Sequence, residues 1–166
     1  MGNVDDLANR YVEQWAPLNP TGATFIGIPG YDDKLDDLSP EGFAAQAEFL
    51  RRSVAELDVT EPSSEAEQVA KDAMLERLGL ELARHDAGYT ASEISVITSG
   101  IHGLRMVFDL MPTAGEEAAA NIAARLAAFP EAVRQYQRTL VECADAGNVS
   151  PRAQMLAVAG QCDAWT

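Results

Sequence analysis

Side chains able to do chemistry are few and widely spaced in this sequence. Its two histidines are His85 and His102, and its two cysteines are Cys143 and Cys162. The sequence contains no zinc-peptidase His-Glu-x-x-His motif, serine-hydrolase Gly-x-Ser-x-Gly motif, Walker loop or Gly-x-Gly-x-x-Gly motif. The di-iron pattern Glu-x-x-His is also missing, because a leucine and a serine lie three residues before the two histidines. The residues alone therefore predict no catalytic residue and no metal ligand.

The segment SGIHGLRMVFDLMP is the most unusual in the chain. Gly100 and Gly103 flank His102 and leave the backbone there open to close approach, so His102 is a candidate to face a ligand. Arg105 and Asp109 lie four residues apart on the helix that we expect to follow. This spacing is more typical of a surface or half-buried ion pair than of a substrate clamp, so Arg105 is the weaker candidate.

A second candidate group follows Gly30. Tyr31 and Asp32, together with Asp33, come directly after this glycine and could line a cleft. The sequence Gly-Tyr-Asp-Asp is also ordinary turn chemistry, because glycine and aspartate favour turns. Both interpretations, cleft and turn, stay open at this stage.

Composition excludes several partners and indicates a compartment. Twenty-six acidic residues against twelve basic ones give a formal charge of -14, which repels nucleic acid and anionic membrane surfaces. The apolar runs are far shorter than a membrane span, and the acidic N-terminus does not resemble a signal peptide. Cys143 and Cys162, distant in sequence, are expected to be free thiols. We therefore expect a cytoplasmic protein.

The element that must position these residues is a long helix from Ser64 to Gly88. Ser64 with Glu67 three residues on forms a capping box, and Gly88 suits a left-handed helix end. Its apolar residues fall on two sides of the helix, as these positions show: Ala66, Val69, Ala70, Ala73 and Leu80 on one side; Leu75, Leu78 and Leu82 on the other. A helix that is apolar on two sides needs covering from both, so we place it at the centre of the fold.

The rest of the chain predicts further helices and no sheet. Cap residues, prolines and apolar periodicity predict a single all-α domain, residues 1–166, with about six to seven helices. The long connection before Ser39 should be fixed to the core by Phe25, Ile26 and Ile28. The other helices are expected at residues 4–16, 40–57, 101–111, 113–129, 130–147 and from 151 onward, and the segment TASEISVITSG between helices should be extended coil.

Three segments, taken together, resemble a known bacterial family. WAPLNPTGATFIGIPGYDDKLDDLSPEGF, SGIHGLRMVFDLMPT and NIAARLAAFPEAVRQYQRTL are similar to the opening part of the domain-of-unknown-function 885 family. The similarity runs in order from Leu7 to the last helix and consists of Pro, Gly, Asp and aromatic patterns without a catalytic signature. Members of that family are longer, mostly helical, and resemble zinc metallopeptidases through a histidine motif in their C-terminal part, which this chain lacks.

The resemblance implies that the chain is the N-terminal helical portion of a metallopeptidase-like protein, inactive alone. Zinc would belong to the full-length protein, its partners would be the remaining C-terminal part and a peptide substrate, and the substrate-channel candidates are Tyr31, Asp32, His102 and Arg105. This interpretation predicts an exposed apolar patch involving the last helix and residues 100–111. One alternative is a free-standing helical interaction module with a closed polar surface around that helix. The weakest is a small hydrolase or lyase using His102 with Asp109.

Overall fold

The computed structural model describes residues 2–165, which form helices and no strand. This confirms the all-α fold class. The elements in order are α1 (Asn3–Trp15), η1 (Ala16–Leu18), α2 (Pro20–Phe25), α3 (Pro40–Val59), α4 (Glu65–Asp86), α5 (Tyr89–Ser92), α6 (Gly100–Met106), η2 (Val107–Asp109), α7 (Glu116–Asp145) and α8 (Arg152–Ala164), where η denotes a 3-10 helix. Within the described range, no helix is both long and apolar enough to cross a membrane.

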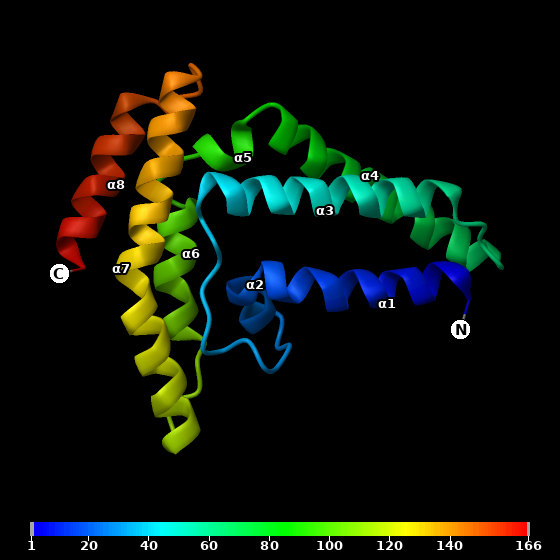
Figure 1. Cartoon of the computed structure of the whole chain (residues 1–166), viewed down its shortest axis with the longest axis horizontal. Coiled ribbons are helices and arrows are strands. Elements are labelled where there is room, and N and C mark those ends of the chain that lie inside the picture. Colours follow the sequence, from blue (N-terminus) through cyan, green and yellow to red (C-terminus); the bar gives the residue numbers. More distant parts are fainter. Residues whose placement is uncertain (1, 166) are drawn as a thin grey trace.

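The helices form two groups that cross one another. Figure 1 shows α1, α3 and α4 running along one direction, and α6, α7 and α8 running across it at one end. α2 and the segment between α2 and α3 lie where the two groups meet. Each group has its own buried cluster. Val4, Leu7 and Leu57 fill the first, and the second contains Leu38, Ile94, Leu104, Ala132, Tyr136 and Val158.

Side-chain caps fix the starts of α3 and α4, as the sequence predicts. The Ser39 hydroxyl accepts a hydrogen bond from the Gly42 amide at 3.0 Å, and the Ser64 hydroxyl accepts one from the Glu67 amide at 3.2 Å. These bonds satisfy amides that have no partner inside the first turn of a helix. Gly88 has φ of 71° and follows the end of α4, so its predicted left-handed conformation is confirmed.

The predicted central position of α4 is wrong. Leu78 is buried, but Val69 is 65% exposed and Leu80 is 51% exposed. α4 therefore lies at the edge of the first group, with one apolar side in solvent. The sequence pattern overestimated the coverage because alanines contribute little to an apolar face, and three of the five residues on the side of Val69 and Leu80 are alanine.

α7 is one helix of 30 residues, whereas we expected two helices divided at Pro130. Pro130 removes one backbone bond, to the Leu126 carbonyl, but Pro130 and Leu126 both lie on the exposed side, where water can bond that carbonyl. Buried residues follow one stripe through the proline: Ala118, Arg125, Ala132, Tyr136 and Thr139. The helix expected from residue 113 begins later, at Glu116, and Gly115 precedes its first turn without a side-chain bond.

Two predictions about loops need correction. Phe25 and Ile26 are 44% and 63% exposed, so they do not fix the connection to the core, and Ile28 is half-buried. Pro20, Thr21 and Ala23 are buried there instead. The segment expected to be extended coil begins with the short helix α5, and a single β-bridge then joins Ile94 to Ser99.

Candidate functional site

An extended segment, Lys34–Ser39, runs between the two helix groups and has a hollow on each side. One hollow, of about 310 Å³, is lined by Pro17, Leu18, Pro20, Lys34, Leu35, Asp37, Glu41, Gly42 and Ala45. On the other side two adjoining hollows, of about 410 Å³ and 250 Å³, lie against α7 and share Asp37, Glu131 and Gln135. We call this set the junction groove, and it is the candidate site.

The junction groove is lined by charges of both signs. Lys34, Asp37 and Glu41 line its first hollow. On the α7 side, the Arg138 guanidinium contacts the Glu41 carboxylate at 2.6 Å, and Arg134 contacts Glu131 at 2.8 Å. These ion pairs are exposed, so they add little to stability.

α7 and α3 hold the groove segment in place through its backbone. The Thr139 hydroxyl donates to the Leu38 carbonyl at 2.7 Å, a buried bond from α7. On the α3 side, a Cβ added to Gly42 would lie 2.1 Å from the Asp37 carbonyl oxygen, so a residue without a side chain is needed there. The wall of the groove is thus fixed by backbone contacts at both neighbouring helices.

Arg125 of α7 is the strongest anchor and is fully buried, with 0% of its surface exposed. Its Nε donates to the Lys34 carbonyl at 2.8 Å, and its Nη2 donates to the Thr24 hydroxyl at 2.7 Å and to the Tyr31 carbonyl at 3.1 Å. Three points of the chain between residues 24 and 34 therefore converge on one guanidinium. Because arginine stays charged, these bonds are charge-assisted and strong.

Acidic side chains surround this anchor. Burial lowers the pKa of Arg125, while the nearby carboxylates Asp32, Asp36 and Asp33 raise it. Asp36 accepts a hydrogen bond from the Thr21 amide at 2.8 Å, yet burial raises its pKa above the usual value. The carboxylates balance the buried charge, and an added anion would meet their repulsion.

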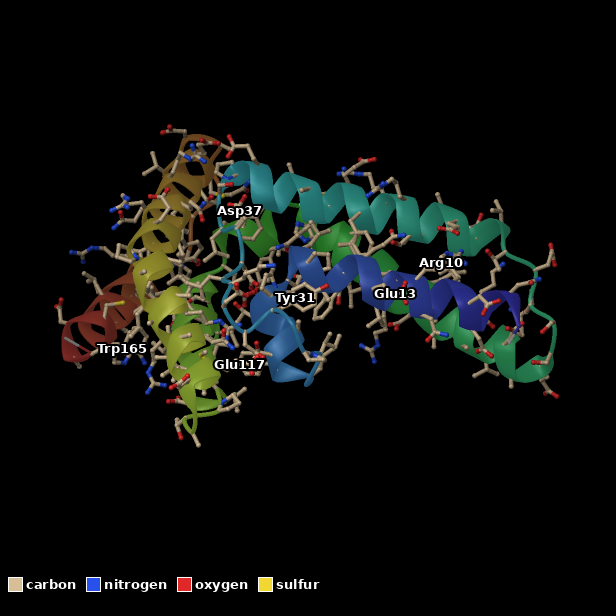
Figure 2. All side chains as sticks on the ribbon, turned by 60° about the horizontal axis from the view of Figure 1, so that its bottom comes forward. Arg10, Glu13, Tyr31, Asp37, Glu117 and Trp165 are labelled. Carbon is tan, nitrogen blue, oxygen red and sulfur yellow. The ribbon has the colours of Figure 1, made fainter. Side chains whose placement is uncertain are left out.

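Tyr31 and Asp32, two of the predicted site residues, belong to this anchored loop. The Tyr31 ring lies under the Lys34 ammonium, 5.6 Å from its centre, and the Asp32 carboxylate accepts from the Thr24 hydroxyl at 2.7 Å. Figure 2 labels two residues of the connection between α2 and α3: Tyr31 and, nearer α3, Asp37. Neither Tyr31 nor Asp32 lines a hollow of the junction groove; both lie in the turn just before Lys34, which does.

His102 lies on α6, away from the groove, and is buried. Its Nδ1 is 2.6 Å from the Ser99 hydroxyl, and its Nε2 is 3.1 Å from Oε1 of Gln161. Because Oε1 accepts only, Nε2 carries the proton and the Ser99 hydroxyl donates to Nδ1. The Trp165 indole packs edge-on against the imidazole, with ring centres 5.6 Å apart. Both nitrogens of His102 are therefore occupied by contacts within the chain.

Arg105 pairs with Asp109, as their spacing predicts, and both side chains are exposed. His102 makes its contacts with Ser99, Gln161 and Trp165, not with Asp109. The four substrate-channel candidates thus separate into Tyr31 and Asp32 near the groove and His102 and Arg105 on α6.

Sequence reasoning missed Arg125, although a signal for it exists. Ala118, Arg125 and Ala132 are seven residues apart, so they lie on the same side of a helix. An arginine between two alanines that face the core must itself be buried and needs several acceptors. The carbonyl-rich Gly-Pro-Asp segment before α3 supplies them, but the expected break at Pro130 hid the continuous stripe.

The remaining side chains able to do chemistry are the two cysteines and the potential metal ligands. Both cysteines are free and half-buried, and burial raises the pKa of each thiol. Among residues 2–165, no group of three or more His, Cys, Asp or Glu side chains is arranged to hold a metal ion.

Comparison with known proteins gives the family. Residues 20–166 match the family described as "Bacterial protein of unknown function (DUF885)". The matched range covers the groove segment, Arg125 and all of the helices from α2 onward. No curated protein matches the chain. Since the match covers most of the sequence, the chain belongs to the bacterial DUF885 family.

Proposed function

We propose that this chain is a helical lobe of a metallopeptidase-like protein, which shapes peptide access and leaves catalysis and zinc to another part of the protein. Its natural partner is then the remainder of the same protein. In this proposal the lobe acts in the cytoplasm.

The observation that carries the proposal is the distribution of exposed apolar side chains. Leu110 beyond α6 is 51% exposed, Leu126 in the first half of α7 is 57% exposed, and Leu156 of α8 is 58% exposed. Met106, Met155 and Trp165 are also exposed in the same elements. Exposed apolar side chains on these elements support a surface that another part covers. Others are exposed elsewhere, among them Val69 and Leu80 of α4. A free-standing module would instead present a polar surface around α8.

The junction groove supports the second half of the proposal. Its first hollow combines an apolar wall, including Leu18 and Leu35, with the charged side chains of Lys34 and Glu41. An extended peptide offers apolar side chains, backbone amides and terminal charges, which match such a lining. Because Arg125 and Thr139 fix the groove segment, the wall is formed before a peptide arrives.

The test compares zinc-dependent peptide hydrolysis by the 166-residue chain with hydrolysis by a form extended with any coding sequence that follows Thr166. We expect activity in the extended form and none in the short one. Peptidase activity of the short chain, purified to homogeneity, would overturn the proposal.

A variant pair tests the role of the groove within the extended form. Ala45 lines the first hollow, so Ala45→Phe should fill it and raise KM for peptides. Ala55→Phe on the same helix, also exposed but away from the hollow, is the matched control. Equal KM values for the two variants would remove the groove from the proposal.

A further inference from the structure

The groove segment, residues 34–39, is extended but pairs with no strand among residues 2–165. Figure 1 shows it as a nearly straight connection that leads into α3. In an extended chain, the N–H and C=O groups of one residue point to the same side, and those of the next residue point to the opposite side. The direction of a few backbone groups therefore gives the direction of the others.

Helix α7 occupies one side of the groove segment. The Lys34 carbonyl accepts a hydrogen bond from Arg125, and the Leu38 carbonyl accepts one from Thr139. Both donors belong to α7. The even-numbered residues of the segment therefore turn their backbone groups toward α7.

Leu35 and Asp37, at the odd positions, turn their backbone groups to the opposite side. The close approach of Gly42 agrees with this, because a Cβ added there would lie 2.1 Å from the Asp37 carbonyl oxygen, and Gly42 belongs to α3. That carbonyl is covered. Among residues 2–165, however, no group bonds to the N–H or C=O of Leu35 or to the N–H of Asp37. Two donors and one acceptor thus lie without a partner in residues that line the first hollow.

The first hollow suits a short stretch of extended peptide. Its volume of about 310 Å³ lies at the lower end of the range for ligand sites. Pro17, Leu18 and Pro20 form an apolar wall of the same hollow. A peptide that bonds to the unpaired backbone groups can therefore place an apolar side chain against this wall.

One charge that lines this hollow is available to a ligand. Glu41 pairs with Arg138 at 2.6 Å, and the Lys34 ammonium lies 5.6 Å from the centre of the Tyr31 ring. Asp37 is exposed and takes part in no ion pair within the described range, residues 2–165. A basic side chain of a peptide in the hollow would pair with this carboxylate.

We propose that an extended peptide binds the groove segment as an added strand. One peptide amide donates to the Leu35 carbonyl, two peptide carbonyls accept from the Leu35 and Asp37 amides, and a basic peptide side chain pairs with Asp37. The inference rests on the proposed function for its class of ligand and adds the mode of binding. Backbone pairing selects unfolded, extended segments and excludes proline at the paired position, because proline has no N–H group.

The first experiment measures binding of the acetylated and amidated pentapeptide Val-Lys-Val-Thr-Val to the isotope-labelled 166-residue chain by nuclear magnetic resonance. We expect the Leu35 and Asp37 amides to become protected from solvent exchange, while the Asp36 amide on the α7 side changes little. Asp37→Asn should weaken binding about threefold or more, since one ion pair is lost. Asp33→Asn, exposed in the same loop and outside the hollow, should not.

The second experiment methylates the peptide nitrogens one at a time. Because a single peptide amide donates, methylation at one position should weaken binding about tenfold or more, and methylation at its two neighbours should have little effect. Ala45→Phe should abolish binding and Ala55→Phe should not. No binding at millimolar peptide, or equal effects of methylation at every position, would overturn the inference.

These measurements separate the inference from the proposed function, because binding to the 166-residue chain needs no zinc and no hydrolysis. Strand-like binding, together with an extended form that hydrolyses no peptide, would support the inference and overturn the proposed function. Hydrolysis by the extended form, without the single-position effect of methylation, would overturn the inference alone.

Discussion

The loop between α2 and α3 and the helix α8 contrast in how they are held. The loop has almost no regular structure, yet Arg125 with 0% exposure bonds to it at residues 31 and 34, and to Thr24 at the end of α2. α8 is a regular helix of 13 residues, yet Val158 is its one buried residue among those described. Regular backbone geometry and firm attachment are therefore independent in this molecule.

The two kinds of attachment suit different functions. A groove needs a wall that does not move, and the loop supplies one because its backbone carbonyls are bonded to a buried charge. α8 keeps its shape although little of it is buried, because the backbone bonds of a helix are internal. The groove wall thus has the firm attachment that its proposed role requires.

The largest effect is expected for Arg125→Ala. The substitution leaves the Lys34 and Tyr31 carbonyls without their buried donor, so the free energy of unfolding should fall by about 3–5 kcal/mol. Urea denaturation measures it. Arg134→Ala, on the same helix but exposed, should change stability by less than about 1 kcal/mol. Similar losses for the two variants would show that the loop does not depend on its anchor.

A smaller loss is expected for Gly42→Ala, which places a methyl group against the Asp37 carbonyl. The groove segment must shift, at a cost of about 1–3 kcal/mol. The control, Gly79→Ala, adds the same methyl group in open space within α4 and should stabilise by about 0.5–1 kcal/mol. Thermal unfolding of the pair gives the sign directly, and a stabilising Gly42→Ala would contradict the close approach.

Val158→Ala tests the other side of the comparison. The lost methyl groups should lower the local opening free energy of α8 by about 1–2 kcal/mol. Hydrogen exchange should detect this within α8 and show little change in α3. Leu156→Ala, on the exposed side of α8, should change either value by about 0.5 kcal/mol or less. A loss spread equally over the whole molecule would mean that α8 is part of the cooperative core.

The last effect depends on pH. Glu67→Gln keeps one acceptor oxygen but places a donor NH2 group where the other carboxylate oxygen accepts from a backbone amide, so stability should fall at neutral pH. The Glu67 carboxylate accepts from the Ser63 amide at 2.6 Å and from the Val4 amide at 3.1 Å, and these bonds lower its pKa. A lowered folded pKa means that the stabilisation is present above the unfolded pKa and is lost as pH falls through the folded pKa.

Thermal unfolding between neutral and acidic pH should therefore show a steeper loss of Tm for the unmodified chain than for Glu67→Gln. Glu65→Gln, two residues earlier on α4 and exposed, should follow the unmodified chain. Parallel pH profiles for all three proteins would refute the role of the Glu67 carboxylate.

The predictable parts of the fold are those that local chemistry decides. Ser39 and Ser64 cap helices because the bond lies within three residues, and Gly88 ends one because of its own backbone freedom. The ion pair of Arg105 with Asp109 is equally local. These features do not depend on how the helices pack.

Features set by packing could not be read from the sequence in the same way. Leu80 of α4 is apolar but exposed, since no other element reaches its side of the helix. Pro130 continues a helix because its side faces solvent, which depends on the position of neighbouring helices. The junction groove arises where residues 34–42 meet α7, and its anchor Arg125 is 91 residues from its partner Lys34.

Native-state hydrogen exchange, measured residue by residue, is the most direct test of the contrast between the loop and α8. The Ala23 amide of α2 and the Ile28 and Lys34 amides of the loop after it are hydrogen-bonded, and all three should exchange only through global unfolding. The Val158 amide should exchange through a local opening of lower free energy. Protection of Val158 equal to that of Ala23, or fast exchange of the loop amides, would contradict the account.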